Sequence, residues 1–159
     1  MKFYNREHEM AKLKEVREQA YNDHSRLTVV TGRRRIGKTS LIIKAMEGEP
    51  FIYLFVGRKN EATLCTSYCK EIASKLNIFV PSITTFQELF AFLMQQGETR
   101  KFTLVIDEFQ EFFHINPSIY SDIQNYWDQY RLNTHVNFIV SGSVYSLMTQ
   151  IFQHYHEPL

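Results

Sequence analysis

The stretch TVVTGRRRIGKTSLI, residues 28–42, constrains the fold of this chain more than any other segment. It begins as a run of β-branched apolar residues, which is typical of a buried strand. The run ends at Gly32, and a helix-forming segment begins near Lys38. Between them, GRRRIGKT fits the pattern G-x-x-x-x-G-K-[ST], a loop whose backbone N–H groups can surround phosphates. We therefore expect an α/β fold with this loop between a strand and a helix.

Strands and helices alternate along the rest of the chain. Short, continuous apolar runs predict four strands, at residues 26–31, 50–56, 101–106 and 135–140. The helical spacing of apolar residues predicts helices at residues 5–22, 38–48, 60–76, 84–97, 117–132 and 144–155. Asn60 and Thr85 stand where helix caps are expected, and Gly48 stands where a helix is expected to end. This order predicts a parallel sheet covered by helices on both faces.

The spacing of the loop follows from what a phosphate-binding loop must do. Gly32 and Gly37 give the backbone freedom for close approach, and the helix that begins near Lys38 directs its positive end toward the phosphates. Lys38 would reach the β and γ oxygens, and the Thr39 hydroxyl would bind Mg²⁺. The candidate nucleotide contacts are Gly32, Arg33, Arg34, Arg35, Ile36, Gly37, Lys38, Thr39 and Ser40.

Polar residues also follow two later strands, and the carboxyl ends of parallel strands form the ligand-binding edge of such sheets. Asp107 and Glu108 end the third strand. Asp107 would hold Mg²⁺ through its water shell, and Glu108 would orient and activate a water molecule that attacks the γ-phosphate. Ser141 follows the fourth strand, where its hydroxyl would lie near that phosphate; alternatively, it belongs to a turn capped by Ser143.

Three consecutive arginines, Arg33 to Arg35, occupy the variable positions of the loop. Because the backbone N–H groups of such a loop face the phosphates, we expect these side chains to point mainly outward. Three interpretations stay open: a solvated basic rim with acidic partners, contact with another domain, subunit or nucleic acid, and direct contact with the nucleotide. Arg58 and Lys59, after the second strand, either add to the positive field or form a solvated turn.

Composition and charge exclude several classes of protein. With 44% hydrophobic and 22% charged residues, the chain is typical of a globular protein rather than a disordered one. The formal net charge of +1 gives no support to a dedicated nucleic-acid binder. The N-terminus has no apolar secretory segment, and no apolar run approaches the roughly 20 residues that span a bilayer. The cytoplasm is therefore the expected location.

Cysteine and aromatic residues are interpreted as structural. Cys65 and Cys69 lie four positions apart and share a helix face; we expect buried free thiols, with half of a metal site as the alternative. Base-stacking platforms need exposed aromatic residues interleaved with basic ones. Four aromatic residues near the third strand and in a later helix are interleaved mainly with apolar residues and are expected in the core: Phe109, Phe112, Phe113 and Trp127.

The segments GRRRIGKTSLI, LVIDEFQE and IVSGS together resemble those of the archaeal-type ATPase family, which is also found in bacteria. This family is related to the AAA+ and STAND P-loop ATPases, which place an extra strand between the Walker A and Walker B strands and use a catalytic glutamate. The segment FYNREHE, residues 3–9, resembles a motif that lies near the adenine in these proteins. Asn5 replaces the glycine of that motif and tolerates a positive φ better than most residues. The resemblance adds Asn5 and Arg6 to the candidate nucleotide contacts.

The resemblance implies a P-loop NTPase fold, a three-layer α/β/α sandwich around a parallel sheet, with ATP and Mg²⁺ as cofactors. It implies ATP binding and Mg²⁺-dependent hydrolysis, with Lys38, Glu108 and Ser141 as catalytic residues and with Thr39 and Asp107 at the metal. The main alternative is a non-catalytic nucleotide-binding switch that mediates assembly or contact with DNA. A small-molecule phosphotransferase and a nucleic-acid module built on the loop arginines are further alternatives.

Members of this family continue well past the length of this chain, with a fifth strand, a lid and often a nuclease-like domain. We therefore expect residues 1–159 to form an incomplete P-loop ATPase domain, cut after the fourth core strand. In the family's sheet the added strand lies beside residues 26–31, followed by 135–140, 101–106 and 50–56. An uncovered edge at 26–31 predicts that the isolated chain self-associates or is unstable. The partners implied are a nucleotide, a second copy of the chain, and DNA through the absent region, with no membrane.

Overall fold

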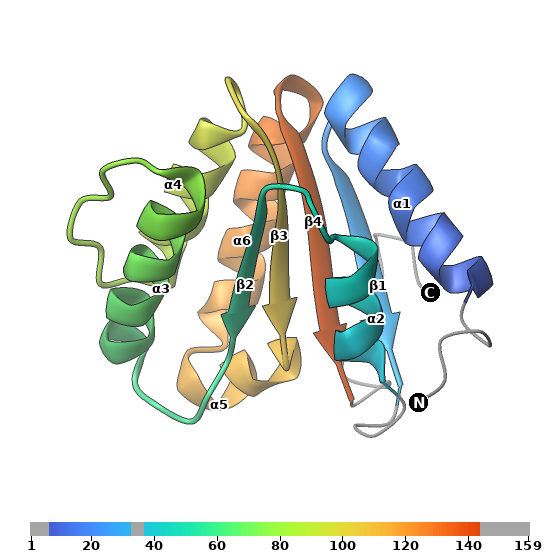
Figure 1. The fold of residues 1–159 in the computed structure, drawn as a ribbon. Helices are drawn as coiled ribbons and strands as arrows, with labels where there is room; N and C mark the ends of the chain where they lie inside the picture. Colours follow the sequence, from blue (N-terminus) through green and yellow to red (C-terminus); the bar gives the residue numbers. More distant parts are fainter. Residues whose placement is uncertain (1–6, 33–36, 144–159) are drawn as a thin grey trace.

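The computed structural model describes residues 7–32 and 37–143. Its centre is a parallel sheet formed by β1 (Arg26–Thr31), β2 (Phe51–Phe55), β3 (Lys101–Asp107) and β4 (His135–Gly142). The strand order is β1-β4-β3-β2, and each neighbouring pair is parallel (Figure 1). The arrows in Figure 1 point the same way, so the carboxyl ends lie at one edge of the sheet. The predicted strands and their order are confirmed for the described part of the chain.

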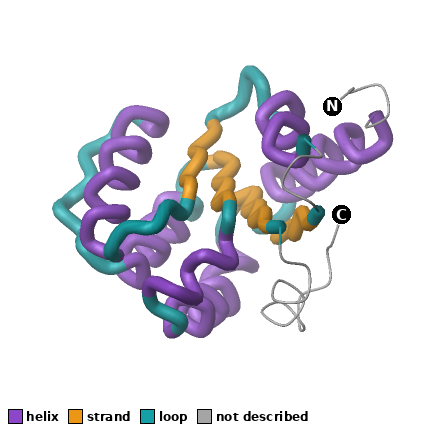
Figure 2. The backbone as a smooth tube through the Cα atoms, turned by 90° about the horizontal axis from the view of Figure 1, so that it is seen from below, coloured by secondary structure: helices purple, strands orange, loops and turns teal. Residues whose placement is uncertain are grey.

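Helices cover both faces of this sheet. The longer ones are α1 (Glu7–Asn22), α2 (Lys38–Ala45), α3 (Glu61–Leu76), α4 (Phe86–Gln96) and α6 (Ser118–Tyr130), which continues into the 3₁₀ turn η3 (Arg131–Asn133). α1 and α2 pack on one face, and α3, α4 and α6 pack on the other. Seen from below in Figure 2, the strands form a band with helices on either side. The predicted three-layer α/β fold is confirmed.

Polar caps begin the helices α3 and α4. The side chain of Asn60 accepts a hydrogen bond from the backbone N–H of Thr63 at 2.8 Å, and the Thr85 hydroxyl accepts one from the N–H of Glu88 at 3.4 Å. These bonds satisfy N–H groups that have no partner in the first turn of a helix. Both predicted helix starts are therefore confirmed.

The structure differs from the sequence-based prediction in three segments. β4 continues to Gly142, so Ser141 lies within the strand rather than after it. α2 ends at Ala45 rather than at Gly48, which instead lies in the following turn with a φ of 82°. Between β3 and α6 the chain forms two short helices, η2 (Phe109–Glu111) and α5 (Phe112–Ile115). Such short elements carry too little periodicity to be recognised in a sequence.

The larger apolar cluster lies between the sheet and the helices α3, α4 and α6. Its aromatic rings contact one another: the ring centroids of Phe109 and Phe112 are 5.7 Å apart, as are those of Trp127 and Phe138. The prediction that Phe109, Phe112 and Trp127 are core residues is confirmed. It is wrong for Phe113, which is 51% exposed. Neighbouring side chains on a helix point in different directions, so Phe113 turns away from the core that buries Phe112.

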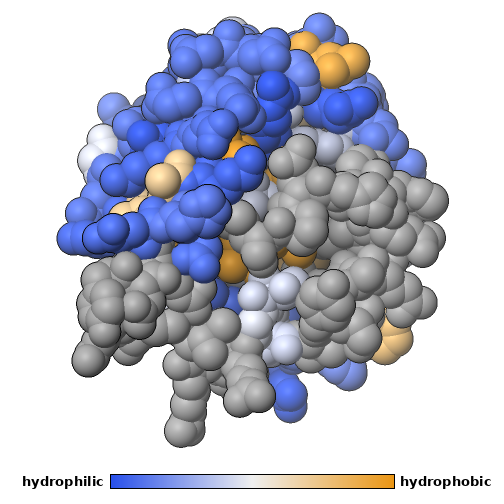
Figure 3. Space-filling model, turned by 90° about the vertical axis from the view of Figure 1, so that its right-hand side faces the viewer, coloured by the Kyte–Doolittle hydropathy of each residue, from blue (hydrophilic) through white to orange (hydrophobic). Residues whose placement is uncertain are grey.

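β1 lies at the edge of the described sheet, where it pairs with β4. On the face of the molecule nearest to α1, the described side chains are mainly hydrophilic (Figure 3). Self-association through the β1 edge stays a prediction.

Within residues 7–32 and 37–143, none of the helices combines the length and the apolar character that crossing a membrane would require.

Gly97 follows α4 in a buried position where a side chain has no room. A methyl group there would overlap Cγ2 of Val136 and lie 3.3 Å from Cβ of Thr134. We expect Gly97→Ala to lower the free energy of unfolding in urea by about 1–3 kcal/mol, the usual cost of overpacking. Gly57→Ala is the control, because its methyl group would meet only ring carbons of Phe55, at 3.8 and 3.9 Å. Equal unfolding midpoints for the two variants would contradict this account of Gly97.

The two cysteines are free thiols that differ in exposure, with Cys65 buried and Cys69 partly exposed. Burial, followed by the charge of Glu61, raises the pKa of the Cys65 thiol to about 12. Because the thiolate is the reactive form, we expect iodoacetamide at mildly alkaline pH to modify Cys69 and to spare Cys65 in the folded protein. Peptide mass spectrometry would detect each adduct, with a urea-unfolded sample as control. Rapid labelling of Cys65 in the folded protein would show that it is accessible.

Candidate functional site

The carboxyl edge of the sheet brings together the polar residues that the sequence singles out. β4 lies between β1 and β3, and Ser141 of β4 pairs with Val30 of β1. Asp107 ends β3 on the other side of β4. α2 starts at Lys38, after the loop that follows β1. Side chains from separate parts of the sequence therefore meet at this edge.

The side chain of Asp107 lies at the centre of this arrangement and is 4% exposed. Its Oδ2 atom accepts hydrogen bonds from the Thr39 hydroxyl, at 2.9 Å, and from the Tyr53 hydroxyl. Its Oδ1 atom accepts from the Ser141 hydroxyl at 2.7 Å and from the backbone N–H of Glu108 at 2.9 Å. An ionised carboxylate accepts hydrogen bonds at both oxygens, and these donors hold both oxygens of Asp107.

The start of α2 lies at the same edge of the sheet. Gly37 precedes the helix with a φ of 80°, in the left-handed region that favours glycine. Its carbonyl accepts a helical bond from the N–H of Leu41 at 2.9 Å. Lys38 is 2% exposed, whereas Thr39 is half-buried and Ser40 is exposed. The N–H groups of the first helical turn and a buried ammonium group both favour a bound anion.

Glu108 combines a buried side chain with a left-handed backbone. Its φ and ψ are 57° and 45°, a conformation that costs a non-glycine residue on the order of 1–3 kcal/mol. The side chain is 6% exposed, and its Oε2 accepts a hydrogen bond from the Gln110 amide. The same Gln110 nitrogen lies 3.4 Å from the Ser143 hydroxyl and so links the segments that follow β3 and β4. Strain of this kind persists where surrounding contacts fix it, and it is frequent at functional sites.

Two of these residues, Tyr53 and Gln110, are not among the site residues predicted from the sequence. Tyr53 lies within β2, where an aromatic residue in an apolar run is typical of core packing. Burial, followed by the hydrogen bond to Asp107, raises the pKa of Tyr53, so its hydroxyl stays a donor. Gln110 follows the acidic pair closely in the segment DEFQE, and this nearness was the one available signal for it.

Six of the predicted nucleotide contacts lie outside the described residues: Asn5, Arg6, Arg33, Arg34, Arg35 and Ile36. Their roles stay predictions, and the three interpretations of the loop arginines stay open. Gly32 is the last described residue before the loop arginines, and Gly37 is the first after them.

The side-chain oxygen atoms of Thr39 and Asp107 are suitable ligands for a magnesium ion. Mg²⁺ prefers oxygen ligands and is usually bound through one or two carboxylates together with phosphate oxygens and water. A hydroxyl that donates its hydrogen to a carboxylate keeps lone pairs that can face a metal. In the part of the chain that the structure describes, no group of three or more His, Cys, Asp or Glu could hold a metal ion. Thr39 and Asp107 would therefore share the ion with phosphate oxygens and water.

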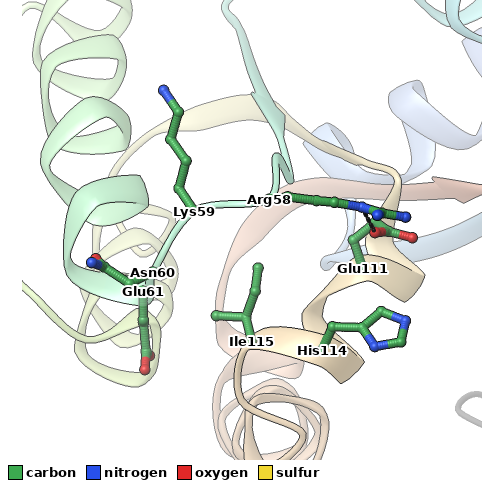
Figure 4. Close-up of a pocket in the computed structure, with 7 residues that line it drawn as sticks. All are labelled: Arg58, Lys59, Asn60, Glu61, Glu111, His114 and Ile115. Carbon is green, nitrogen blue, oxygen red and sulfur yellow. Dashed lines mark hydrogen bonds and ion pairs between the residues drawn. The ribbon is translucent and has the colours of Figure 1, made fainter.

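A hollow of about 640 Å³ lies between the loop after β2, the start of α3, and α5 (Figure 4). Its lining residues are Arg58, Lys59, Asn60, Glu61, Glu111, His114 and Ile115. Nε of Arg58 lies 3.3 Å from Oε1 of Glu111, and the Arg58 side chain is 88% exposed, which supports a solvated turn. Glu61 accepts hydrogen bonds from the N–H of Phe86 at 2.7 Å and from the Asn116 amide at 3.1 Å. Its carboxylate therefore joins the starts of α3 and α4 to the segment after α5.

One relative of known sequence matches almost the whole chain. It is an uncharacterized protein of Methanocaldococcus jannaschii, 31% identical over 161 residues. The match covers 99% of this chain and 33% of that protein. The chain therefore spans a third of the length of this relative.

Solved structures share the fold at low sequence identity. Cdc6p from Pyrobaculum aerophilum aligns with a TM-score of 0.69 at 20% identity, over 99% of this chain and 45% of that one. A Walker-type ATPase of Pyrococcus abyssi aligns with a TM-score of 0.68 at 22% identity, over 93% and 47%. The ORC2 protein of Aeropyrum pernix, in ADPNP–ADP complexes, aligns with a TM-score of 0.63 at 16% identity, over 97% and 46%. These TM-scores establish a common fold, which is all that a comparison shows at identities this low, and this chain spans less than half of each of these proteins.

A family model covers the chain almost from end to end. It describes an ATPase domain predominantly from Archaea and matches residues 3–157, which include the phosphate loop and the acidic end of β3. The resemblance expected from the sequence is thereby confirmed. This chain belongs to the family of ATPase domains found predominantly in Archaea.

Proposed function

We propose that this chain binds ATP together with Mg²⁺ and, in the intact protein, forms the catalytic core of an ATPase. One observation carries the proposal: the Thr39 hydroxyl donates to Oδ2 of Asp107 at 2.9 Å. These residues are 68 positions apart, and their contact brings the phosphate-loop helix to the acidic end of β3. In P-loop nucleotide sites, a loop hydroxyl and a strand carboxylate act together on the magnesium ion. Membership of an ATPase family supports the same proposal.

Lys38 and the start of α2 would bind the phosphates. Lys38 is 2% exposed, and burying a charged side chain is costly unless an ion of opposite charge accompanies it. The β and γ phosphates of ATP would be such anions, and the N–H groups of the first turn of α2 would add donors. Mg²⁺, when bound, would neutralise charge that develops on the phosphates during transfer.

Glu108 is the residue we assign to the water that attacks the γ-phosphate. General-base chemistry requires a carboxylate held within reach of that water, and the Gln110 amide restricts how the Glu108 side chain can turn. Ser141 was expected near the γ-phosphate, and its hydroxyl donates to Oδ1 of Asp107. We therefore assign Ser141 a positioning role that acts through Asp107.

Lys38→Met should weaken ATP binding while keeping the aliphatic part of the side chain in place. We expect the dissociation constant for ATP with Mg²⁺, measured by calorimetry, to rise by about tenfold or more. Lys44→Met is the matched control, since Lys44 lies on the same helix and its side chain is 53% exposed. Its Nζ atom lies 3.5 Å from Oε2 of Glu47. Equal affinities for the two variants would rule out Lys38 as a phosphate ligand.

Glu108→Gln should preserve ATP binding and lower turnover, because the amide cannot accept the proton of the attacking water. Removal of a general base reduces the rate by about 10²–10⁴-fold, and phosphate release by the intact protein would measure this loss. Glu111→Gln is the control, because Glu111 is the next acidic residue and pairs with Arg58.

These two measurements also separate the alternative function. A wild-type protein that binds ATP with Mg²⁺ and releases no phosphate would favour the non-catalytic switch. Turnover that is unchanged in Glu108→Gln would remove Glu108 as the base. Absence of ATP binding at any Mg²⁺ concentration would overturn the proposed function as a whole.

A further inference from the structure

We propose that Tyr53 is a positioning residue for the metal site and that its hydroxyl orients the Asp107 carboxylate. This inference rests on the binding of ATP with Mg²⁺ proposed above. The Tyr53 hydroxyl donates to Oδ2 of Asp107, the same oxygen that accepts from Thr39. The hydrogen bond therefore acts on the side of the carboxylate that faces the phosphate-loop helix.

The register of the sheet explains how Tyr53 reaches this oxygen. β2 and β3 are parallel, and Tyr53 pairs with Val105. Residues two apart on a strand share a face, so Asp107 lies on the same face as Val105, two residues nearer the carboxyl edge. Two residues span about 6.6 Å along a strand, a length that a tyrosine side chain can cross. The hydroxyl of Tyr53 therefore meets Asp107 because this register directs the ring along β3.

The four hydrogen bonds to Asp107 divide between its two oxygens. Ser141 and the N–H of Glu108 hold Oδ1, while Thr39 and Tyr53 hold Oδ2. Rotation about the last bond of an aspartate side chain is broad, so its plane is set by such contacts. Thr39 would itself contact the ion, which leaves Tyr53 as the donor on Oδ2 that can keep the carboxylate in place independently of the ion.

A purely structural role for Tyr53 predicts a different outcome. The ring packs with the smaller apolar cluster under α2, and its centroid lies 6.4 Å from that of Phe51. Tyr53→Phe keeps this ring and removes only the hydroxyl. A hydroxyl that serves folding alone would change stability without changing the response to Mg²⁺. A hydroxyl that orients a metal-binding carboxylate would change that response. Mutation of residues that hydrogen-bond to metal ligands typically lowers metal affinity by about 10- to 100-fold.

Tyr68→Phe is the matched control for this test. Its hydroxyl donates to the carbonyl of Phe55 at 2.7 Å, from the opposite face of β2, within the larger cluster. Both variants therefore remove a hydroxyl that has a hydrogen-bond partner. The difference is that the Tyr53 hydroxyl bonds to Asp107, whereas the Tyr68 hydroxyl bonds to the carbonyl of Phe55.

The test measures ATP affinity by calorimetry over a series of Mg²⁺ concentrations and in EDTA, for the wild type and both variants. We expect Tyr53→Phe to raise the Mg²⁺ concentration for half-maximal tightening of ATP binding by about tenfold. Affinity in EDTA should stay within about twofold of the wild type, because the phosphate ligands are intact. Tyr68→Phe should leave both quantities unchanged, and urea titrations without Mg²⁺ would compare the stability of the two variants.

Three results would overturn the inference. The first is that Tyr53→Phe reaches half-maximal tightening of ATP binding at the same Mg²⁺ concentration as the wild type. The second is a loss of affinity in EDTA that equals the loss with Mg²⁺, and the third is an equal shift in Tyr68→Phe. If the wild type itself does not bind ATP with Mg²⁺, the proposed function fails and this inference with it. That failure is distinguishable, because it appears in the wild type before any variant is compared.

Discussion

The carboxylate of Asp107 is the group on which the geometry of the whole edge depends. It accepts hydrogen bonds from α2 through Thr39, from β2 through Tyr53, from β4 through Ser141, and from the backbone N–H of Glu108. A buried carboxylate loses its solvation and must regain it through such bonds. Because the donors come from different elements, the requirement fixes those elements relative to one another. The position of the candidate metal ligand is thus set by the sheet and its register.

Much of this arrangement could be predicted from the sequence, because it depends on local patterns. The strands follow from apolar runs, and the starts of α3 and α4 follow from Asn60 and Thr85. Asp107 and Glu108 could be assigned to the edge of the sheet because parallel strands bring their carboxyl ends together. Each of these inferences needs information from a short stretch of chain and one general rule of packing.

The contacts that the sequence did not predict depend on register or on backbone conformation. Tyr53 is 54 positions from Asp107, and its contact exists because Tyr53 pairs with Val105 rather than with a neighbouring residue. A shift of one residue would turn its side chain to the other face of the sheet. Gln110 meets Glu108 because Glu108 is left-handed and the chain then turns into η2. Neither feature has a sequence signature of its own.

The burial of Lys38 shows how packing and chemistry are joined in α2. Lys38, Leu41, Ile42 and Ala45 are the buried residues of this helix, at the spacing that forms one stripe along a helix. The three apolar members pack against the smaller cluster on the sheet, and Lys38 continues the same stripe to the carboxyl edge. A rotation of α2 by one residue, about 100°, would carry Lys38 away from that edge and expose part of the apolar stripe. The apolar contacts that hold α2 on the sheet therefore also hold Lys38 at the start of the helix and the Thr39 hydroxyl beside Asp107.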